Sequence, residues 1–256
     1  MKSFIIVAFA SIIIFALSCN VENKRVEIQE TYKVAKDKGV KKQDSKIVQK
    51  VNFLIDFSDY PGGVIDKWLE SKGFYFDRKA RNRKLIELSA NKGGLLFKAL
   101  KPVRCFIINK TVNLKEFSKV RIEWGITQFP TDASYERENR NEALIVYIFF
   151  GDKKLSSGSF VIPDCPYFIG LFLSKDDKIN KPYKGRYFHN GGRFVCVGNP
   201  EVKETIISEF DLVRAFQTYY KDEVPAITGL CLEVDTSSSG DGGKATAFIK
   251  RIEFLK

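Results

Sequence analysis

The stretch GLCLEVDTSSSGDGGKATAFIKRIEF, residues 229–254, shows how this chain is built. An apolar run ends at Glu233 and Asp235, a loop of serines and glycines carries Asp241, and a second apolar run follows. Strand-forming residues on both sides of such a loop predict two β-strands. The acids leave three interpretations open: a metal-binding loop, a catalytic carboxylate pair, or only the turn that joins the last two strands of a sheet.

The same pattern recurs from Val51 onward, as short apolar runs between turn residues. The strand-like segments are 51–57, 84–90, 95–100, 105–112, 119–129, 143–151 and 168–174. The sequence RYFHNGGRFVCVG, residues 186–198, predicts a hairpin, because Asn190-Gly191-Gly192 tolerates the positive φ angles of a tight turn. In the last strand a slip of the alternation near Lys250 predicts a β-bulge.

Residues 209–223 differ from the rest of the domain. Their apolar residues recur at three- and four-residue steps, which predicts one amphipathic helix that covers an end or edge of a sheet; the predicted face is Phe210, Val213, Phe216, Gln217 and Tyr220. About ten strands and one late helix predict an all-β domain, a two-sheet antiparallel sandwich of jelly-roll type. Trp124 alternates in phase with apolar neighbours and is predicted to point into the core.

The N-terminus, residues 1–19, has the features of an export signal. Lys2 precedes an apolar segment from Phe4 to Leu17, which is shorter than the roughly 20 residues of a spanning helix. The residues before Cys19 resemble a bacterial lipobox, so Cys19 is the predicted lipidation site. An ordinary signal peptidase is the alternative and would leave a free thiol. The sequence therefore predicts a membrane-anchored lipoprotein that faces the periplasm or the cell surface.

Residues 20–50 read as a charged flexible tether before a single domain at 51–256. The tether carries nine Lys and Arg and five Asp and Glu, a net charge of +4. That charge serves solubility or attracts anionic lipid head groups. Of the chain's total of +11, a mild and scattered +6 falls on the domain. Without a basic stripe or a nucleic-acid-binding motif, nucleic acid is not a predicted partner.

The domain contains four of the five cysteines, at positions 105, 165, 196 and 231. None has the C-x-x-C spacing of a metal or redox site, and each lies in an apolar stretch. Disulfides and buried free thiols both remain open.

Four segments appear in a recognisable order: KVRIEWGITQFP (119–130), NEALIVYIFFG (141–151), RFVCVGNP (193–200) and residues 211–254. This order resembles the bacterial domain of unknown function 3047 (DUF3047) family. Its members have a tryptophan strand, an acidic pair before a second strand, a helix, and an acid-rich loop before a closing strand. The resemblance covers most of residues 51–256 and implies a β-sandwich similar to carbohydrate-binding modules, without a known activity.

The acids of the quoted stretch are the candidate metal ligands. Glu233 and Asp235 are two apart in a strand and project to one face, and Asp241 could complete an oxygen-rich shell for a structural calcium ion. A solvated turn flanked by charges is the alternative. No other cofactor is predicted.

Catalytic patterns are weak in this chain. Glycoside hydrolysis needs two suitably spaced acids, and no spacing identifies such a pair. His189 is the only histidine, which excludes a multi-histidine metal site. A G-x-S-x-G nucleophile motif is absent from the sequence.

The segment NKPYKGRYFHNGGR, residues 180–193, is the predicted ligand-binding surface. Tyrosine faces pack on sugar rings, and neighbouring cations favour acidic glycans or phosphate-bearing head groups; the candidate residues are Tyr183, Arg186, Tyr187 and His189. The alternative is a hairpin with an amphipathic outer face. The sequence thus predicts an exported, lipid-anchored, non-enzymatic binding module for envelope carbohydrate. A scaffold that contacts another envelope protein and a hydrolase with an unrecognised carboxylate pair remain the alternatives.

Overall fold

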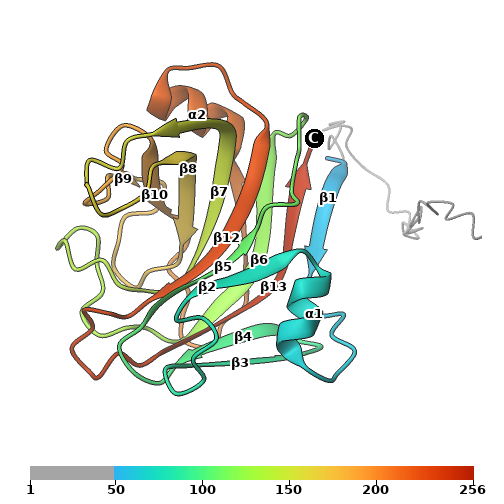
Figure 1. Ribbon diagram of the computed structural model, residues 1–256, viewed down its shortest axis with the longest axis vertical. Helices are drawn as coiled ribbons and strands as arrows, with labels where there is room; N and C mark the ends of the chain where they lie inside the picture. Colours follow the sequence, from blue (N-terminus) through green and yellow to red (C-terminus); the bar gives the residue numbers. More distant parts are fainter. Residues whose placement is uncertain (1–48) are drawn as a thin grey trace, which may run out of the picture. The chain divides into compact units, whose positions relative to one another are not determined.

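The computed structural model describes residues 49–256, whose strands form two sheets packed face to face (Figure 1). The six-stranded sheet contains β11 (Ile206–Asp211), β6 (Lys119–Gln128), β13 (Ala245–Leu255), β4 (Gly94–Ala99) and β3 (Ile86–Asn91), with β1 (Val51–Asp56) also paired to β13. The seven-stranded sheet runs β2 (Phe74–Arg78), β5 (Arg104–Asn109), β12 (Ile227–Asp235), β7 (Glu142–Leu155), β8 (Cys165–Phe172), β10 (Gly192–Cys196) and β9 (Pro182–Tyr183). The predicted all-β sandwich is confirmed.

The main core lies between the sheets and is built from alternate residues of each strand. Trp124 of β6 is 1% exposed, and its indole nitrogen donates a hydrogen bond to the Ser208 hydroxyl. The predicted core position of Trp124 is therefore confirmed. In β7 both faces are apolar, so Val146 and Ile148 enter this core while Ile145 and Tyr147 join a second cluster on the other face of the sheet.

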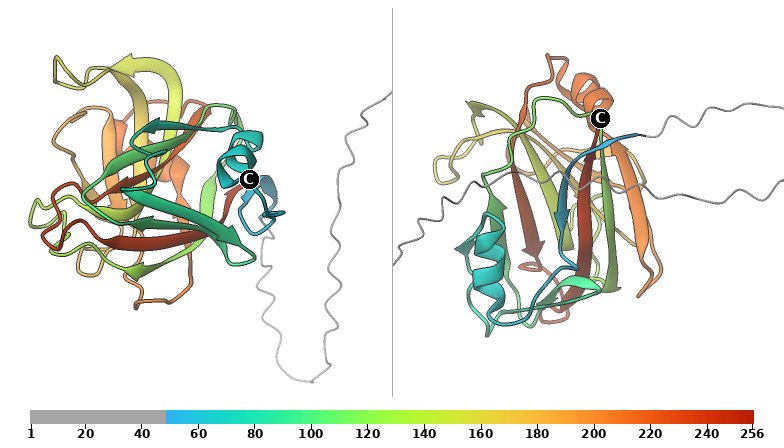
Figure 2. Two further views of the ribbon diagram at one scale, coloured as in Figure 1. Left: turned by 60° about the horizontal axis from the view of Figure 1, so that its bottom comes forward. Right: turned by 90° about the vertical axis from the view of Figure 1, so that its right-hand side faces the viewer.

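The structure has two helices in the described residues, where one was predicted. The predicted helix is α2 (Leu212–Tyr220), which begins after Asp211 because the Asp211 carboxylate accepts a hydrogen bond from the Arg214 amide. The expected start at residue 209 was wrong, since residues 206–211 pair with β6. The additional helix is α1 (Ile65–Ser71), which buries Trp68 and Leu69. The two helices lie at opposite ends of the sandwich (Figures 1 and 2).

The quoted stretch forms two strands that belong to different sheets. β12 lies in the seven-stranded sheet and β13 in the six-stranded one, so residues 236–244 cross from one layer to the other. The interpretation as a turn within one sheet was wrong, because a strand-loop-strand pattern does not encode which sheet each strand joins. The predicted bulge at Lys250 is confirmed by a shift of the β13–β6 register between Ile249 and Arg251.

The predicted hairpin around Asn190 was also wrong. β10 pairs in parallel with β8 and antiparallel with β9, so the sheet is mixed instead of purely antiparallel. The segment before β10 closes a turn in which the amides of Gly191 and Gly192 donate to the Phe188 carbonyl. The Phe188 ring packs on Phe168 instead of entering a strand.

The predicted signal peptide, the lipidation site Cys19 and the tether up to residue 48 lie outside the described residues. Within residues 49–256, neither helix has the length and apolar character needed to cross a bilayer.

Candidate functional site

Loops cover the outer face of the seven-stranded sheet. The loop at 129–141 places Tyr135 over this face, where its ring stacks on Phe172 of β8 with 4.6 Å between ring centroids. The same ring lies 5.2 Å from Phe194 of β10 and 5.4 Å from Tyr183 of β9. The 129–141 loop therefore buries a second aromatic cluster, separate from the core between the sheets.

One buried acid, Asp177, holds the 129–141 loop against the sheet. The Asp177 carboxylate accepts hydrogen bonds from the Ser134 hydroxyl (2.8 Å), the Tyr135 amide (3.0 Å), the Glu136 amide (3.1 Å) and the Ser174 hydroxyl (2.9 Å). Asp177 is 2% exposed, so these four donors replace the water it would otherwise bind. The carboxylate is a positioning group for the 129–141 loop.

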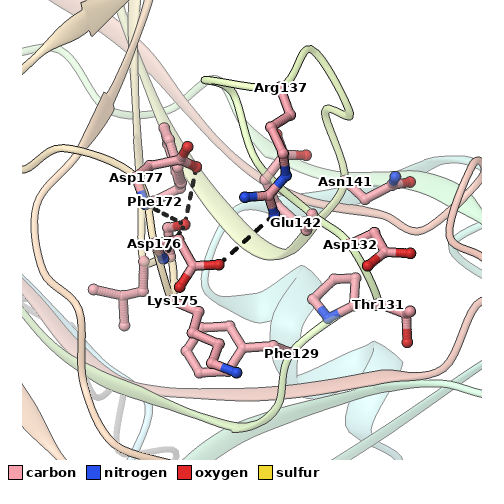
Figure 3. A pocket seen from close by; sticks show the side chains of 14 residues that line it. Phe129, Thr131, Asp132, Arg137, Asn141, Glu142, Phe172, Lys175, Asp176 and Asp177 are labelled. Atoms are coloured by element: carbon pink, nitrogen blue, oxygen red, sulfur yellow. Dashed lines mark hydrogen bonds and ion pairs between the residues drawn. The ribbon is translucent and has the colours of Figure 1, made fainter.

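A pocket of about 320 Å³ lies between this loop and the end of β8 (Figure 3). Polar side chains dominate its wall, and Phe129 and Phe172 supply aromatic surface; the polar members are Thr131, Asp132, Arg137, Asn141, Glu142, Ser174, Lys175, Asp176 and Asp177. Arg137 lies 3.7 Å from the Asp176 carboxylate. Its volume lies at the lower end of the range of small-molecule pockets, and its wall is more polar than theirs usually is.

Glu142, the first residue of β7, has an unsatisfied oxygen in the wall of this pocket. The residue is 4% exposed, and its Oε1 has no hydrogen-bond partner among residues 49–256. Burial, together with the nearby Asp235 and Glu233 carboxylates, raises the pKa of Glu142 well above its usual value. A buried carboxyl oxygen without a partner is rare in proteins and calls for a ligand or a water molecule, although the Tyr135 hydroxyl is close enough to the same carboxyl group to oppose the rise of its pKa.

A buried charge network adjoins Glu142 on the next strands. Asp235 of β12 lies directly opposite Glu142, so the two side chains share the outer face. Arg104 of β5 donates to Glu233 Oε1 at 2.6 Å and lies 3.2 Å from Asp235 Oδ2. The Tyr147 hydroxyl donates to the other Glu233 oxygen. Burial, only partly offset by Arg104, raises the pKa of Glu233.

The three acids predicted to bind calcium do not converge on one point, because Asp241 has a different partner from the other two. Glu233 and Asp235 share Arg104, while Asp241 Oδ1 accepts from the Ser239 hydroxyl at 3.0 Å. In the part of the chain that the structure describes, no three His, Cys, Asp or Glu side chains are grouped so as to hold a metal ion. The calcium site stays a prediction.

The serine and glycine loop has a different structural role, which is to support the pocket. The Ser238 amide donates to Asn141 Oδ1 at 3.0 Å, and the Ser239 hydroxyl accepts from the Thr131 amide at 3.1 Å. Both Asn141 and Thr131 line the pocket. The loop that crosses between the sheets therefore also fixes the position of the 129–142 wall.

The predicted ligand surface at residues 183–189 is only partly exposed. Tyr183 is 8% exposed, and its hydroxyl donates to Glu136 at 2.8 Å. The prediction of an exposed Tyr183 was therefore wrong, because the 129–141 loop covers its ring. Arg186 and His189 are exposed, Tyr187 is half-buried, and the Arg186 guanidinium lies 5.6 Å from the centre of the Tyr187 ring.

Aromatic rings beside cations occur also on β2 and β5, where Tyr75 is exposed and Phe106 is half-buried. The Phe106 ring lies between the guanidinium groups of Arg78 (5.3 Å) and Arg104 (5.6 Å). Tyr75 is 36% exposed and lies 5.0 Å from the Lys110 amine. Arg104 and Phe106 are two residues apart on β5, but Arg78 and Tyr75 come from β2, so no single local sequence pattern contains either whole group.

The four cysteines of the described chain are free, and three of them are buried. Cys105 faces the main core and Cys231 the outer cluster, so the β5–β12 pair does not bring them together. Burial raises the pKa of the Cys105 and Cys165 thiols to about 12.

Glu142 and Asp177 were not among the predicted site residues. The family resemblance places an acidic pair at the position of Asn141 and Glu142, which is the one signal for Glu142 in the sequence, whereas Asp177 lies in a polar loop and resembles an ordinary boundary residue. No family model matches this chain, and no curated protein matches it significantly. The resemblance to the DUF3047 family stays a prediction.

Proposed function

We propose that the protein is a non-enzymatic binding module that takes a sugar of an envelope carbohydrate into the pocket beside Glu142. The unsatisfied Glu142 Oε1 carries this proposal. Burial raises the pKa of Glu142 and so favours the neutral acid, and in that form the side chain both donates and accepts a hydrogen bond. A sugar hydroxyl satisfies both roles.

The rest of the pocket wall supports a ligand of this class. Sugars present hydroxyl groups that need paired donors and acceptors, and Asn141, Asp132 and Lys175 supply such groups from different segments. Sugars also present C–H faces that pack on aromatic rings, and Phe129 and Phe172 line the same pocket. The exposed Tyr75 ring and the half-buried Phe106 ring lie on the same outer face of the sheet and offer a further stacking surface for a longer chain.

Binding accounts for the acids better than hydrolysis does. Arg104 and Tyr147 occupy both oxygens of Glu233, and Asp235 accepts from Ser237 and faces Arg104. Neither Glu233 nor Asp235 lines the pocket. Export and lipid anchoring through Cys19 belong to this proposal and place the module at the cell envelope.

The test is binding of muropeptides and of neutral and acidic oligosaccharides to the full chain, read by calorimetry. Glu142→Leu removes the polar group and should abolish binding, while Glu142→Gln keeps a donor and an acceptor and should retain most of it. Glu209→Gln, on the outer face of the other sheet, is the matched control and should bind as the wild type does. Equal binding by wild type and Glu142→Leu, or no binding of any oligosaccharide, would exclude the proposal.

A further inference from the structure

The tip loop, residues 156–164, connects β7 to β8. It exposes two adjacent large apolar side chains. Phe160 has a relative exposure of 113% and Val161 of 89%, the two highest among the large apolar residues of the described chain. The others, such as Val64, Val202 and Ile207, reach about 60% at most. Figure 2 (left) shows the end of β7 and this loop, in yellow, standing out from the sandwich. Single exposed apolar residues are common, but an adjacent pair at a loop tip is not.

Internal hydrogen bonds hold the tip loop in this form. Ser157 is 2% exposed; its amide donates to the Asp164 carboxylate at 3.0 Å and its hydroxyl to the Ile162 carbonyl at 2.6 Å. The Ser157 carbonyl accepts from the Phe188 amide at 3.0 Å, which fixes the loop to its neighbour. The Ser157 side chain therefore points inward, while Phe160 and Val161 point outward.

Four cations lie on the two segments that adjoin the tip loop. Lys153 and Lys154 end β7, and Lys184 and Arg186 lie in the neighbouring loop that Phe188 joins to Ser157. All four side chains are exposed, and none forms an ion pair with residues 49–256. Asp152 and Asp164 are the acids of the β7–β8 connection, and Asp164 is engaged by the Ser157 amide. The tip thus combines apolar side chains with an excess of positive charge.

We infer that the tip loop is a membrane-contact site that inserts Phe160 and Val161 into a bilayer containing anionic lipids. Interfacial binding depends on apolar area buried in the head-group region plus attraction of cations to anionic lipids. Two side chains supply far less than the roughly 800 Å² per partner of a stable protein interface, whereas a bilayer accepts a small apolar tip. This contact is independent of the sugar pocket and of residues 1–48.

The experiment places a tryptophan at the tip of the full chain. The native Trp68 and Trp124 are 8% and 1% exposed, so they are shielded from lipid, and Phe160→Trp reports on the loop. We expect its fluorescence to be quenched several-fold by brominated phosphatidylcholine in vesicles that also contain phosphatidylglycerol. Replacement of both Lys153 and Lys154 by Gln should reduce this quenching.

Val202→Trp is the matched control, because Val202 is an exposed apolar residue on the loop before β11. Both variants carry the same N-terminal residues, so any membrane contact made there affects them equally. Equal quenching of the two variants overturns the inference and would leave a protein surface as the partner of the tip. Glycan binding by the Phe160→Trp variant should remain that of the wild type, which separates this result from the fate of the pocket.

Discussion

The two sheets carry charge on their outer faces, but only one of these faces is covered. On the six-stranded sheet Arg121 pairs with Glu209 (3.0 Å) and Glu253 (3.2 Å), and about a third of the Arg121 and Glu209 side chains is exposed to solvent. On the seven-stranded sheet the partner of Arg104 is Glu233, whose side chain is 1% exposed. The sheets thus use similar residues in different surroundings.

The difference shows what the covering loops add. A solvent-exposed ion pair contributes little to stability, because water screens the two charges and hydrates each of them almost as well as the partner stabilises it. Under the loops, hydration is lost, so the pKa of Glu233 and of Glu142 is raised by burial and one Glu142 oxygen is left without a partner. The covered face can therefore hold a ligand, whereas each acid of the open face has a cation beside it, including Glu123, whose buried Oε2 has no hydrogen bond but lies 2.6 Å from the Arg251 guanidinium.

The largest expected effect is on the covered face, from Arg104→Ala. This change leaves the buried Glu233 and Asp235 carboxylates without their shared cation. Breaking a fully buried pair costs about 3–5 kcal/mol, and because Arg104 is itself 46% exposed we expect a loss of about 2 kcal/mol in the free energy of unfolding. Urea denaturation at neutral pH measures it.

Arg121→Ala is the matched control for this substitution, since Arg121 also bridges two acids on neighbouring strands. We expect a smaller loss there. The double substitution Arg104→Ala with Glu233→Gln should recover part of the stability by removing the buried charge. Equal losses for the two arginines would mean that loop cover has no energetic consequence.

The second prediction concerns pH and Glu142→Gln. Because burial raises the folded pKa of Glu142 above the ordinary value of 4.5, the folded protein holds this proton at pH values where the unfolded chain has lost it. The free energy of unfolding of the wild type therefore falls as pH rises above about 4.5, and Gln has no proton to lose. The advantage of Glu142→Gln should grow by up to about 1.4 kcal/mol per pH unit. Unfolding curves of both proteins from about pH 5 to about pH 8 test this.

Parallel stability curves for the two proteins would contradict the raised pKa. The Tyr135 hydroxyl and the Glu233, Asp235 and Arg104 charges act on Glu142 from the neighbouring segments, so all four are kept in both proteins. Glu233→Gln tests the same effect at the adjacent acid, where Arg104 opposes burial and should make the slope shallower.

The sequence predicted most strands and the sandwich, because apolar runs between turn residues reflect local burial. It did not predict sheet membership, since β12 and β13 look like one hairpin until their partners β7 and β6 are known. The parallel pairing of β10 with β8 was missed for the same reason. The short helix α1 has too few residues to show a clear period.

The candidate site was harder to predict than the fold, because it depends on contacts between distant segments. Glu142 is buried by a loop that Asp177 holds in place. It lies opposite Asp235, which belongs to a strand some ninety residues later in the sequence. The predicted residues Glu233 and Asp235 do lie beside the pocket wall, but as partners of Arg104. Tyr183 looked exposed in a basic segment, and only the position of Tyr135 explains its burial.

The smallest expected effect is on the open face, from Glu209→Gln. Hydrogen bonds from Lys119 and Arg121 lower the pKa of Glu209, so its contribution to stability is present above the ordinary pKa of 4.5 and is lost as pH falls through the folded pKa. Since 36% of the side chain is exposed, we expect a cost below about 1 kcal/mol at neutral pH, and less in high salt. Urea denaturation at low and high ionic strength measures it. A cost as large as that of Arg104→Ala, or one that does not depend on salt, would show that ion pairs on the open face are as strong as those on the covered face. Burial of Glu142 under the loops would then no longer identify the covered face as the binding site.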